Sequence, residues 1–142
     1  MTAKEYLQQA YRLDQKINSD IEEVNALRGM AVSVFPQQLV ADRVQTSRRG
    51  DAPYVRSLEK IMEMEDRINT EIDLLVDLKD EIRGIITTVG NTDERMVLRY
   101  RYVHNYTWEQ IANELHVDAR TVRRWHGNAL RHVTLPPKFI II

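Results

Sequence analysis

The sequence predicts an all-α protein in which a long antiparallel, coiled-coil-like helical hairpin precedes a three-helix helix-turn-helix module. Three observations support this fold class. The 142 residues include only five glycines and four prolines, about half of average usage. Apolar residues recur at helical spacing along two long segments. Three short segments near the end begin with residues typical of helix N-termini.

The first helix is predicted at about residues 3–30. Thr2 and Glu5 form a T-x-x-E capping box, which marks a helix start. The apolar stripe has heptad-like spacing, and Leu7 and Ile21 widen it, so this helix is expected to contact more than one surface. The stripe consists of Ala3, Tyr6, Ala10, Leu13, Ile17, Val24 and Leu27.

Residues 32–53 are predicted to form a connection, because they contain Pro36, Pro53 and a polar run. Twenty-odd residues is long for a structureless loop. Arg48 and Arg49 are expected to lie in a solvated part of it.

The second helix is predicted at about residues 54–88, since a proline precedes it and Gly90 suits the position after a helix end. Its apolar stripe is Tyr54, Leu58, Ile61, Ile68, Ile72, Leu75, Ile82, Ile86 and Val89. A hairpin buries one face of each helix, yet both stripes are broad. We therefore expect residues 1–90 to serve interaction or oligomerisation, as in a homodimer. The alternative is that the extra apolar residues pack on the C-terminal helices.

Residues 91–134 predict the helix-turn-helix module. Asn91 or Thr92 caps its first helix, Thr107 and Gln110 form a second capping box, and Asp118 caps the last helix. The first of these helices is expected to continue to Val103. Asn105 follows where the chain must reverse, and asparagine tolerates a left-handed conformation. The helix Asp118–Val133 takes the place of the recognition helix. The inward faces are predicted to be Ile111, Ala112 and Leu115 in the second helix, and Val122, Trp125, Ala129 and Val133 in the third.

The net charge of −1 conceals two regions of opposite sign. Residues 1–90 hold 12 Lys or Arg against 16 Asp or Glu, whereas residues 91–142 hold 8 against 5. The outer face of the last helix carries Arg120, Arg123, Arg124 and Arg131. This asymmetry indicates that the C-terminal region faces a polyanion.

The C-terminal module resembles region 4 of sigma-70-type factors, which recognises the −35 promoter element. The matching residues are Glu94-Arg95, Val97-Leu98-Arg99, Arg101-Tyr102-Val103, Thr107-Trp108-Glu109, Ile111-Ala112, Thr121-Val122 and Ala129-Leu130. The whole layout is similar to small phage-encoded, sigma-region-4-like regulators of the ArpU/RinA type. Residues 1–90 do not resemble sigma region 2, so a complete sigma factor is not implied. The family usually has an apolar residue at position 126, and Trp125 is expected to take over the packing there.

The resemblance implies a transcriptional regulator that binds double-stranded DNA beside RNA polymerase. Arg120 and Arg123 are expected at base edges, with Arg124 at a base or a phosphate, because the guanidinium fork binds guanine bidentately. The start of the second helix is expected to contact backbone phosphates. The full set of candidate DNA-binding residues is Thr107, Trp108, Gln110, Arg120, Thr121, Arg123, Arg124, His126 and Arg131. For Trp108, a packing role is the equal alternative.

Other functional classes find no support in the sequence. It has no cysteine, no paired histidines at metal-ligand spacing, and no phosphate-binding loop or nucleophile motif. We therefore expect no enzyme activity, no metal and no cofactor. The longest apolar run is too short to span a membrane, and a cytoplasmic location is expected. The apolar tail, residues 135–142, is expected to add a strand or to plug against the hairpin or a second subunit.

Two alternative functions stay open. The module could bind polymerase or a sigma factor without reading DNA. The chain could also be a phage packaging protein similar to small terminase subunits, in which, however, the DNA-binding part usually comes first.

Overall fold

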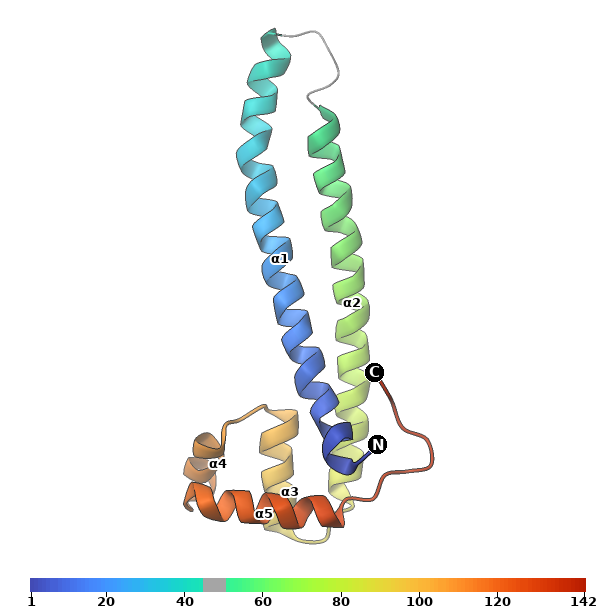
Figure 1. The fold of residues 1–142 in the computed structure, drawn as a ribbon, viewed down its shortest axis with the longest axis vertical. Helices are drawn as coiled ribbons and strands as arrows, with labels where there is room; N and C mark the ends of the chain where they lie inside the picture. The colour runs from blue at the N-terminus through green and yellow to red at the C-terminus, as the bar shows by residue number, and fades with distance from the viewer. Residues whose placement is uncertain (45–50) are drawn as a thin grey trace. The chain divides into compact units, whose positions relative to one another are not determined.

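The fold is described from a computed structural model that covers residues 1–44 and 51–142, with side chains for residues 1–32 and 55–142. These residues contain no strand. In the described residues, five α-helices and one π-helical segment follow one another; Figure 1 labels the α-helices. They are α1 (Ala3–Val44), α2 (Asp51–Thr87), α3 (Thr92–Leu98), η2 (Arg99–Val103), α4 (Trp108–Leu115) and α5 (Ala119–His132). The predicted all-α class, a hairpin followed by a helix-turn-helix module, is confirmed.

The first two helices are longer than the sequence indicated. α1 continues through Pro36 to Val44, and α2 begins at Asp51. The connection predicted at 32–53 was therefore wrong for residues 32–44 and 51–53. A proline inside a helix removes one hydrogen bond at a cost of about 3 kcal/mol, but good helix formers such as Gln and Leu follow Pro36. Residues 45–50, with Arg48 and Arg49, lie outside the described residues.

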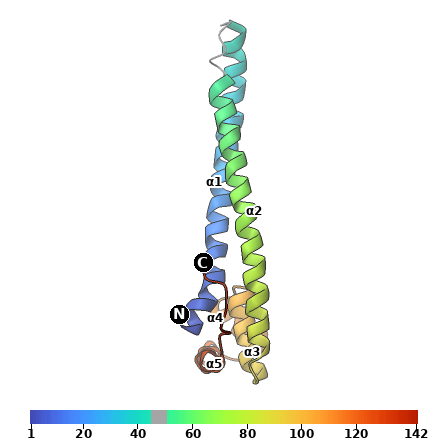
Figure 2. The same ribbon diagram turned by 90° about the vertical axis from the view of Figure 1, so that its right-hand side faces the viewer.

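The chain divides into two compact units. The second unit, Gln15–Asp73, consists of the facing parts of α1 and α2, which run antiparallel (Figure 2). Ion pairs join Lys16 to Glu71 and Arg28 to Glu65 across the two helices. Its buried apolar residues are Ile17, Val24, Ala31, Ile61, Met64 and Ile68. Leu58 and Ile72, both expected in the stripe, are 39% and 38% exposed, whereas Met64, which lies outside the predicted stripe, is buried.

The first unit joins the start of α1, Met1–Asp14, to residues Leu74–Ile142. Tyr6, Leu7 and Ala10 are fully buried in it, as are Leu78 and Ile82 of α2. The predicted capping box at the start of α1 is present, since Thr2 N donates to Glu5 Oε2 and Glu5 N donates to Thr2 Oγ1.

The C-terminal tail returns from α5 to the N-terminal part of α1 (Figure 1). Gln9 holds it through both amide atoms: Nε2 donates to the Ile140 carbonyl at 3.0 Å, and Oε1 accepts from Ile142 N–H at 2.9 Å. The Ile140 N–H donates to Glu81, and the Phe139 ring meets the Tyr6 ring edge-on at 5.4 Å. Ile141 and Ile142 nevertheless remain 66% and 55% exposed. The tail is therefore held by these hydrogen bonds and by the Phe139 contact, and it is not the buried apolar plug that the sequence suggested.

The helix-turn-helix module packs around Val97, Ile111, Ala112 and Val122. Its helices start at the residues that the sequence indicated, with Asn91, Thr107 and Asp118 as N-caps. Two left-handed residues turn the chain. Asn105 (φ 58°) precedes α4, as its side chain type suggested, and His116 (φ 55°) lies in the turn between α4 and α5.

Residues 99–103 form a π-helical turn, which was expected to be ordinary α-helix. The His104 N–H donates to the Arg99 carbonyl, five residues back. Tyr102 and Val103, adjacent in this wide turn, are both buried. At its far end the module is closed by a hydrogen bond of 2.6 Å between His132 Nδ1 of α5 and the buried Glu94 of α3.

Candidate DNA-binding surface

The helix α5 separates a buried face from an arginine-bearing face. Val122, His126 and Ala129 are buried, and they recur at the spacing that keeps residues on one side of a helix. All four of the predicted arginines, Arg120, Arg123, Arg124 and Arg131, are exposed. At 100° per residue, Arg120, Arg124 and Arg131 fall within a stripe of roughly 40°, and Arg123 lies about 60° to one side. The structure therefore brings these four side chains to one face.

The charges on this face are largely uncompensated. Arg123 lies 3.9 Å from Glu109 of α4, but the side chains are 58% and 71% exposed, and such surface pairs contribute little. Among the side chains that the structure describes, in residues 1–32 and 55–142, no carboxylate forms an ion pair with Arg120, Arg124 or Arg131, although Arg120 and Arg124 lie near enough to Asp118 to help lower its pKa. A polyanion can therefore approach all four arginines without first breaking a strong ion pair.

The N-terminus of α5 is fixed by its cap. Asp118 accepts a hydrogen bond of 2.7 Å from Thr121 N–H. The bonds from Thr121, with smaller contributions from Arg120 and Arg124, lower the pKa of the Asp118 carboxyl. This carboxylate stays ionised at neutral pH and orients the first turn of the helix. Thr121 itself is half-buried, so its side chain is less accessible than the arginines beside it.

Thr107 and Gln110 are exposed at the start of α4, where the sequence placed them. Each is already engaged in the capping box: Thr107 N–H donates to Gln110 Oε1 at 2.8 Å, and Gln110 N–H donates to Thr107 Oγ1 at 3.2 Å. The Thr107 hydroxyl proton and the Gln110 Nε2 remain as side-chain donors. Together with the first N–H groups of the helix, they can donate to a phosphate.

The indole of Trp108 makes contacts within the module. The Arg101 guanidinium carbon lies 4.2 Å from its ring centroid, and its ring meets His126 edge-on at 4.8 Å. Arg101 also donates to the Tyr106 carbonyl. Trp108 is half-buried and packs against the module core. The packing alternative therefore describes the contacts of this residue better than a phosphate contact through its side chain.

The prediction that His126 contacts DNA was wrong. It was expected at a phosphate, but only 8% of its surface is exposed. Burial, followed by the nearby Lys4 and Arg101, lowers its pKa to about 4. A neutral imidazole bonded at 2.6 Å to the Tyr102 hydroxyl offers no charge to DNA. The same geometry shows that His126 itself occupies the inward position, whereas Trp125 is half-buried.

Gly127 lies on the arginine face of α5, between Arg120 and Arg123 on the helical wheel and about 20° from Arg120. A Cβ at this position would meet no atom within 4 Å. Packing inside the protein therefore does not require glycine here. The backbone of α5 is bare at the centre of the charged face.

Among the side chains that the structure describes, those of residues 1–32 and 55–142, no group of three or more His, Cys, Asp or Glu is placed to hold a metal ion. Over the same part of the chain, no helix combines the length and the apolar character that crossing a membrane requires.

Residues 91–134 match the family model described as sigma-70, region 4. The matched segment is about a third of the chain and contains α3, η2, α4 and α5. It indicates a DNA-binding helix-turn-helix module, consistent with transcription regulation. No curated protein and no solved structure matches the chain.

Proposed function

We propose that the protein is a sequence-specific DNA-binding transcriptional regulator that inserts α5 into the major groove. The observation that carries this proposal is the exposed, uncompensated arginine face on the second helix of a sigma-region-4-like helix-turn-helix. An α-helix fits the major groove, where arginine can read guanine O6 and N7. Phosphate neutralisation by the same face would supply much of the affinity.

The proposed roles follow from position on the helix. Arg120 and Arg123, in the first two turns of α5, read base edges, and Arg124 contacts a base or a phosphate. Arg131, near the other end of α5, reaches a phosphate. Thr107 and Gln110 hold the phosphate backbone at the start of α4.

The finer biological assignment is part of the proposal. The layout of a helical hairpin before the module resembles phage or prophage regulators of the ArpU/RinA type that work beside RNA polymerase in the cytoplasm. We propose that residues 1–90 form the interaction and oligomerisation part, residues 91–134 the DNA-binding module, and residues 135–142 a tail. Exposed apolar side chains on the hairpin, such as Val55 and Met62 at 46% and 64%, support a dimer. No enzymatic activity, metal or cofactor is assigned.

The experiment is a binding selection on a library of double-stranded promoter sequences, followed by titrations at several salt concentrations. We compare wild type with Arg120→Ala/Arg123→Ala. The control, Arg56→Ala/Lys60→Ala, removes the same charge from exposed residues of α2. Each good bidentate contact discriminates by about 1–3 kcal/mol, so the α5 variant should lose preference for the selected site by at least 10-fold, and the control should keep it.

The alternatives give different results. If the protein shows no DNA sequence preference at moderate salt and instead binds polymerase or a sigma factor, it is a protein-interaction module and this proposal is wrong. Sequence-independent binding together with a large ring-like oligomer would favour a packaging protein. A monomer at all accessible concentrations would refute the dimer alone.

A further inference from the structure

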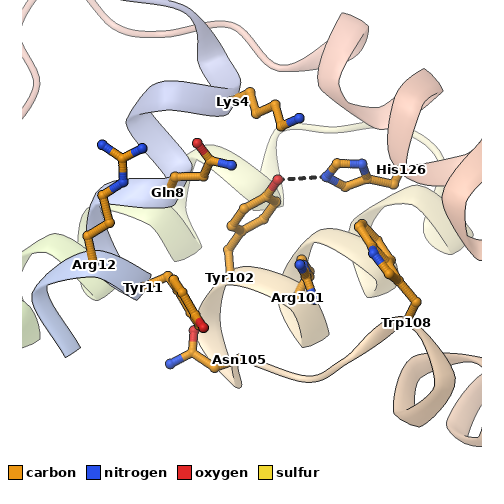
Figure 3. A pocket seen from close by; sticks show the side chains of 9 residues that line it. All are labelled: Lys4, Gln8, Tyr11, Arg12, Arg101, Tyr102, Asn105, Trp108 and His126. Carbon is orange, nitrogen blue, oxygen red and sulfur yellow. Dashed lines mark hydrogen bonds between the residues drawn. The ribbon is translucent and has the colours of Figure 1, made fainter. Parts of the chain in front are cut away.

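The first compact unit contains a pocket of about 570 Å³ between the start of α1 and the helix-turn-helix module (Figure 3). Its volume is within the range of small-molecule sites, which is roughly 300–1,000 Å³. Lys4, Tyr11 and Arg12 line it from α1, and Arg101, Trp108 and His126 line it from the module. The pocket is separate from the arginine face of α5, because Arg120, Arg123 and Arg124 do not line the pocket.

The pocket is lined by cations without matching anions. Three side chains of the lining are permanently charged, and none of its described lining residues is Asp or Glu. Lys4 and Arg12 are exposed and form no ion pair with any residue in the described ranges. Asp14, close in sequence, is already bonded to the Asn105 amide at 3.1 Å. Burial is the main cause of the lowered His126 pKa, and the positive charges of Lys4 and Arg101 lower it further.

The wall between the cations is aromatic and neutral. A hydrogen bond of 2.6 Å joins the Tyr102 hydroxyl to His126 Nε2 (Figure 3). Burial raises the Tyr102 pKa to about 12 and lowers the His126 pKa to about 4, so both groups are neutral at pH 7. Tyr11, which is 48% exposed, adds one flat ring. The half-buried Trp108 adds a second, over which the Arg101 guanidinium lies at 4.2 Å from the ring centroid. A planar heterocycle can stack on such rings.

The pocket-lining residues of α1 are not part of its buried apolar face. Tyr11 and Arg12 lie outside the buried stripe of α1, where Ala10 and Leu13 are the buried neighbours. Lys4, Tyr11 and Arg12 nevertheless lie on one side of α1, at spacings of seven and eight residues. This side of the helix faces the pocket and presents two cations and one aromatic ring to it.

We propose that this pocket binds a nucleotide, with the phosphates at Lys4, Arg12 and Arg101 and the base against Tyr11 and Trp108. The ligand would contact both α1 and α4. It would therefore help to fix the module that carries the arginine face against the start of α1. The inference does not rest on DNA recognition by α5, because the pocket and the α5 face share none of the four arginines.

The test is isothermal titration calorimetry of the full chain with AMP, ATP, adenosine and inorganic phosphate. The nucleotides should bind at least 10-fold more tightly than adenosine or phosphate. Adenosine lacks the phosphate that would contact the cations, and inorganic phosphate lacks the base that would contact the aromatic rings. Lys4→Gln/Arg12→Gln should weaken nucleotide binding by at least 10-fold. Both residues are exposed and unpaired, so this variant is expected to fold. The charge-matched control, Arg56→Gln/Lys60→Gln, should change it by less than 2-fold.

A second readout is specific to the site. A bound phosphate adds negative charge beside His126, so its imidazole pKa, followed by NMR, should rise on nucleotide addition. Equal weakening in both double variants would mean non-specific attraction and would overturn the proposal. So would the absence of nucleotide binding at millimolar concentration. If DNA affinity alone falls in Lys4→Gln/Arg12→Gln while free nucleotides do not bind, the pocket is a DNA phosphate contact and the nucleotide proposal is wrong.

Discussion

Replacing His126 tests the electrostatics of the buried face of α5. Its pKa is about 4 in the folded protein against 6.5 for the unfolded chain. The unfolded chain therefore takes up the proton first as the pH falls. The stability that neutral His126 provides is fully present above pH 6.5 and is lost as the pH falls from 6.5 to 4. Below pH 4 both states are protonated and the loss is complete.

The magnitude follows from the size of the shift. A difference of about 2.5 pKa units corresponds to roughly 3 kcal/mol. One side of the imidazole lines the pocket, where water screens the charge, so we expect half of this, ~1.5 kcal/mol. His126→Gln removes the titration and keeps an oxygen that can accept the Tyr102 hydroxyl. Between pH 7.5 and pH 4.5, wild type should lose ~1.5 kcal/mol more unfolding free energy than this variant.

The assay is urea unfolding at a series of pH values, combined with NMR titration of the histidine Cε1–H resonances. His104→Gln is the control, because His104 is exposed and its removal should leave the wild-type pH profile unchanged. The reasoning fails if the His126 resonance titrates near pH 6.5. It also fails if His126→Gln shows the same loss of stability at acid pH as wild type.

Three substitutions test other parts of the structure. Gln9→Ala removes both hydrogen bonds to the tail and should lower the unfolding free energy by about 2 kcal/mol; an unchanged urea midpoint would show that the tail is not held there. Thr107→Ala removes the cap of α4 and should lower the unfolding free energy by about 1 kcal/mol. Thr107→Ser keeps the capping hydroxyl and should restore the wild-type value. Gly127→Ala and Gly84→Ala should each stabilise by ~0.5–1 kcal/mol, since neither Cβ meets a neighbour. Only Gly127→Ala should weaken binding to the selected promoter, and equal affinities for the two would mean that DNA does not approach the α5 backbone.

The features that sequence predicted best depend on a few adjacent residues. The caps at Thr107 and Asp118 and the left-handed Asn105 follow from side chains that bond, or tolerate strain, within three residues. Local chemistry of this kind is complete in the sequence. The exposed arginine face of α5 followed in the same way from helical periodicity.

The features that sequence missed depend on distant residues. The buried His126 is bonded to Tyr102, which is 24 residues away. Its pKa is lowered first by burial and then by Lys4, which comes from the other end of the chain. The same applies to the pocket, whose cations come from α1 and η2. Helical spacing could have indicated that Lys4 and Arg12 share a side of α1, but it could not indicate what faces that side. The continuation of α1 beyond Pro36 was missed because a proline is a frequent breaker but not an absolute one.

The bonds between Gln9 and the tail have a consequence for folding kinetics. They join residues 131 and 133 positions apart, and the 59 residues of Gln15–Asp73 separate the two segments of the first unit. Closing so long a loop is entropically costly, but the antiparallel pairing of α1 with α2 brings Asp14 and Leu74 together beforehand. We therefore expect the Gln15–Asp73 pair to acquire hydrogen-exchange protection first in pulse labelling. Simultaneous protection of both units would contradict this order.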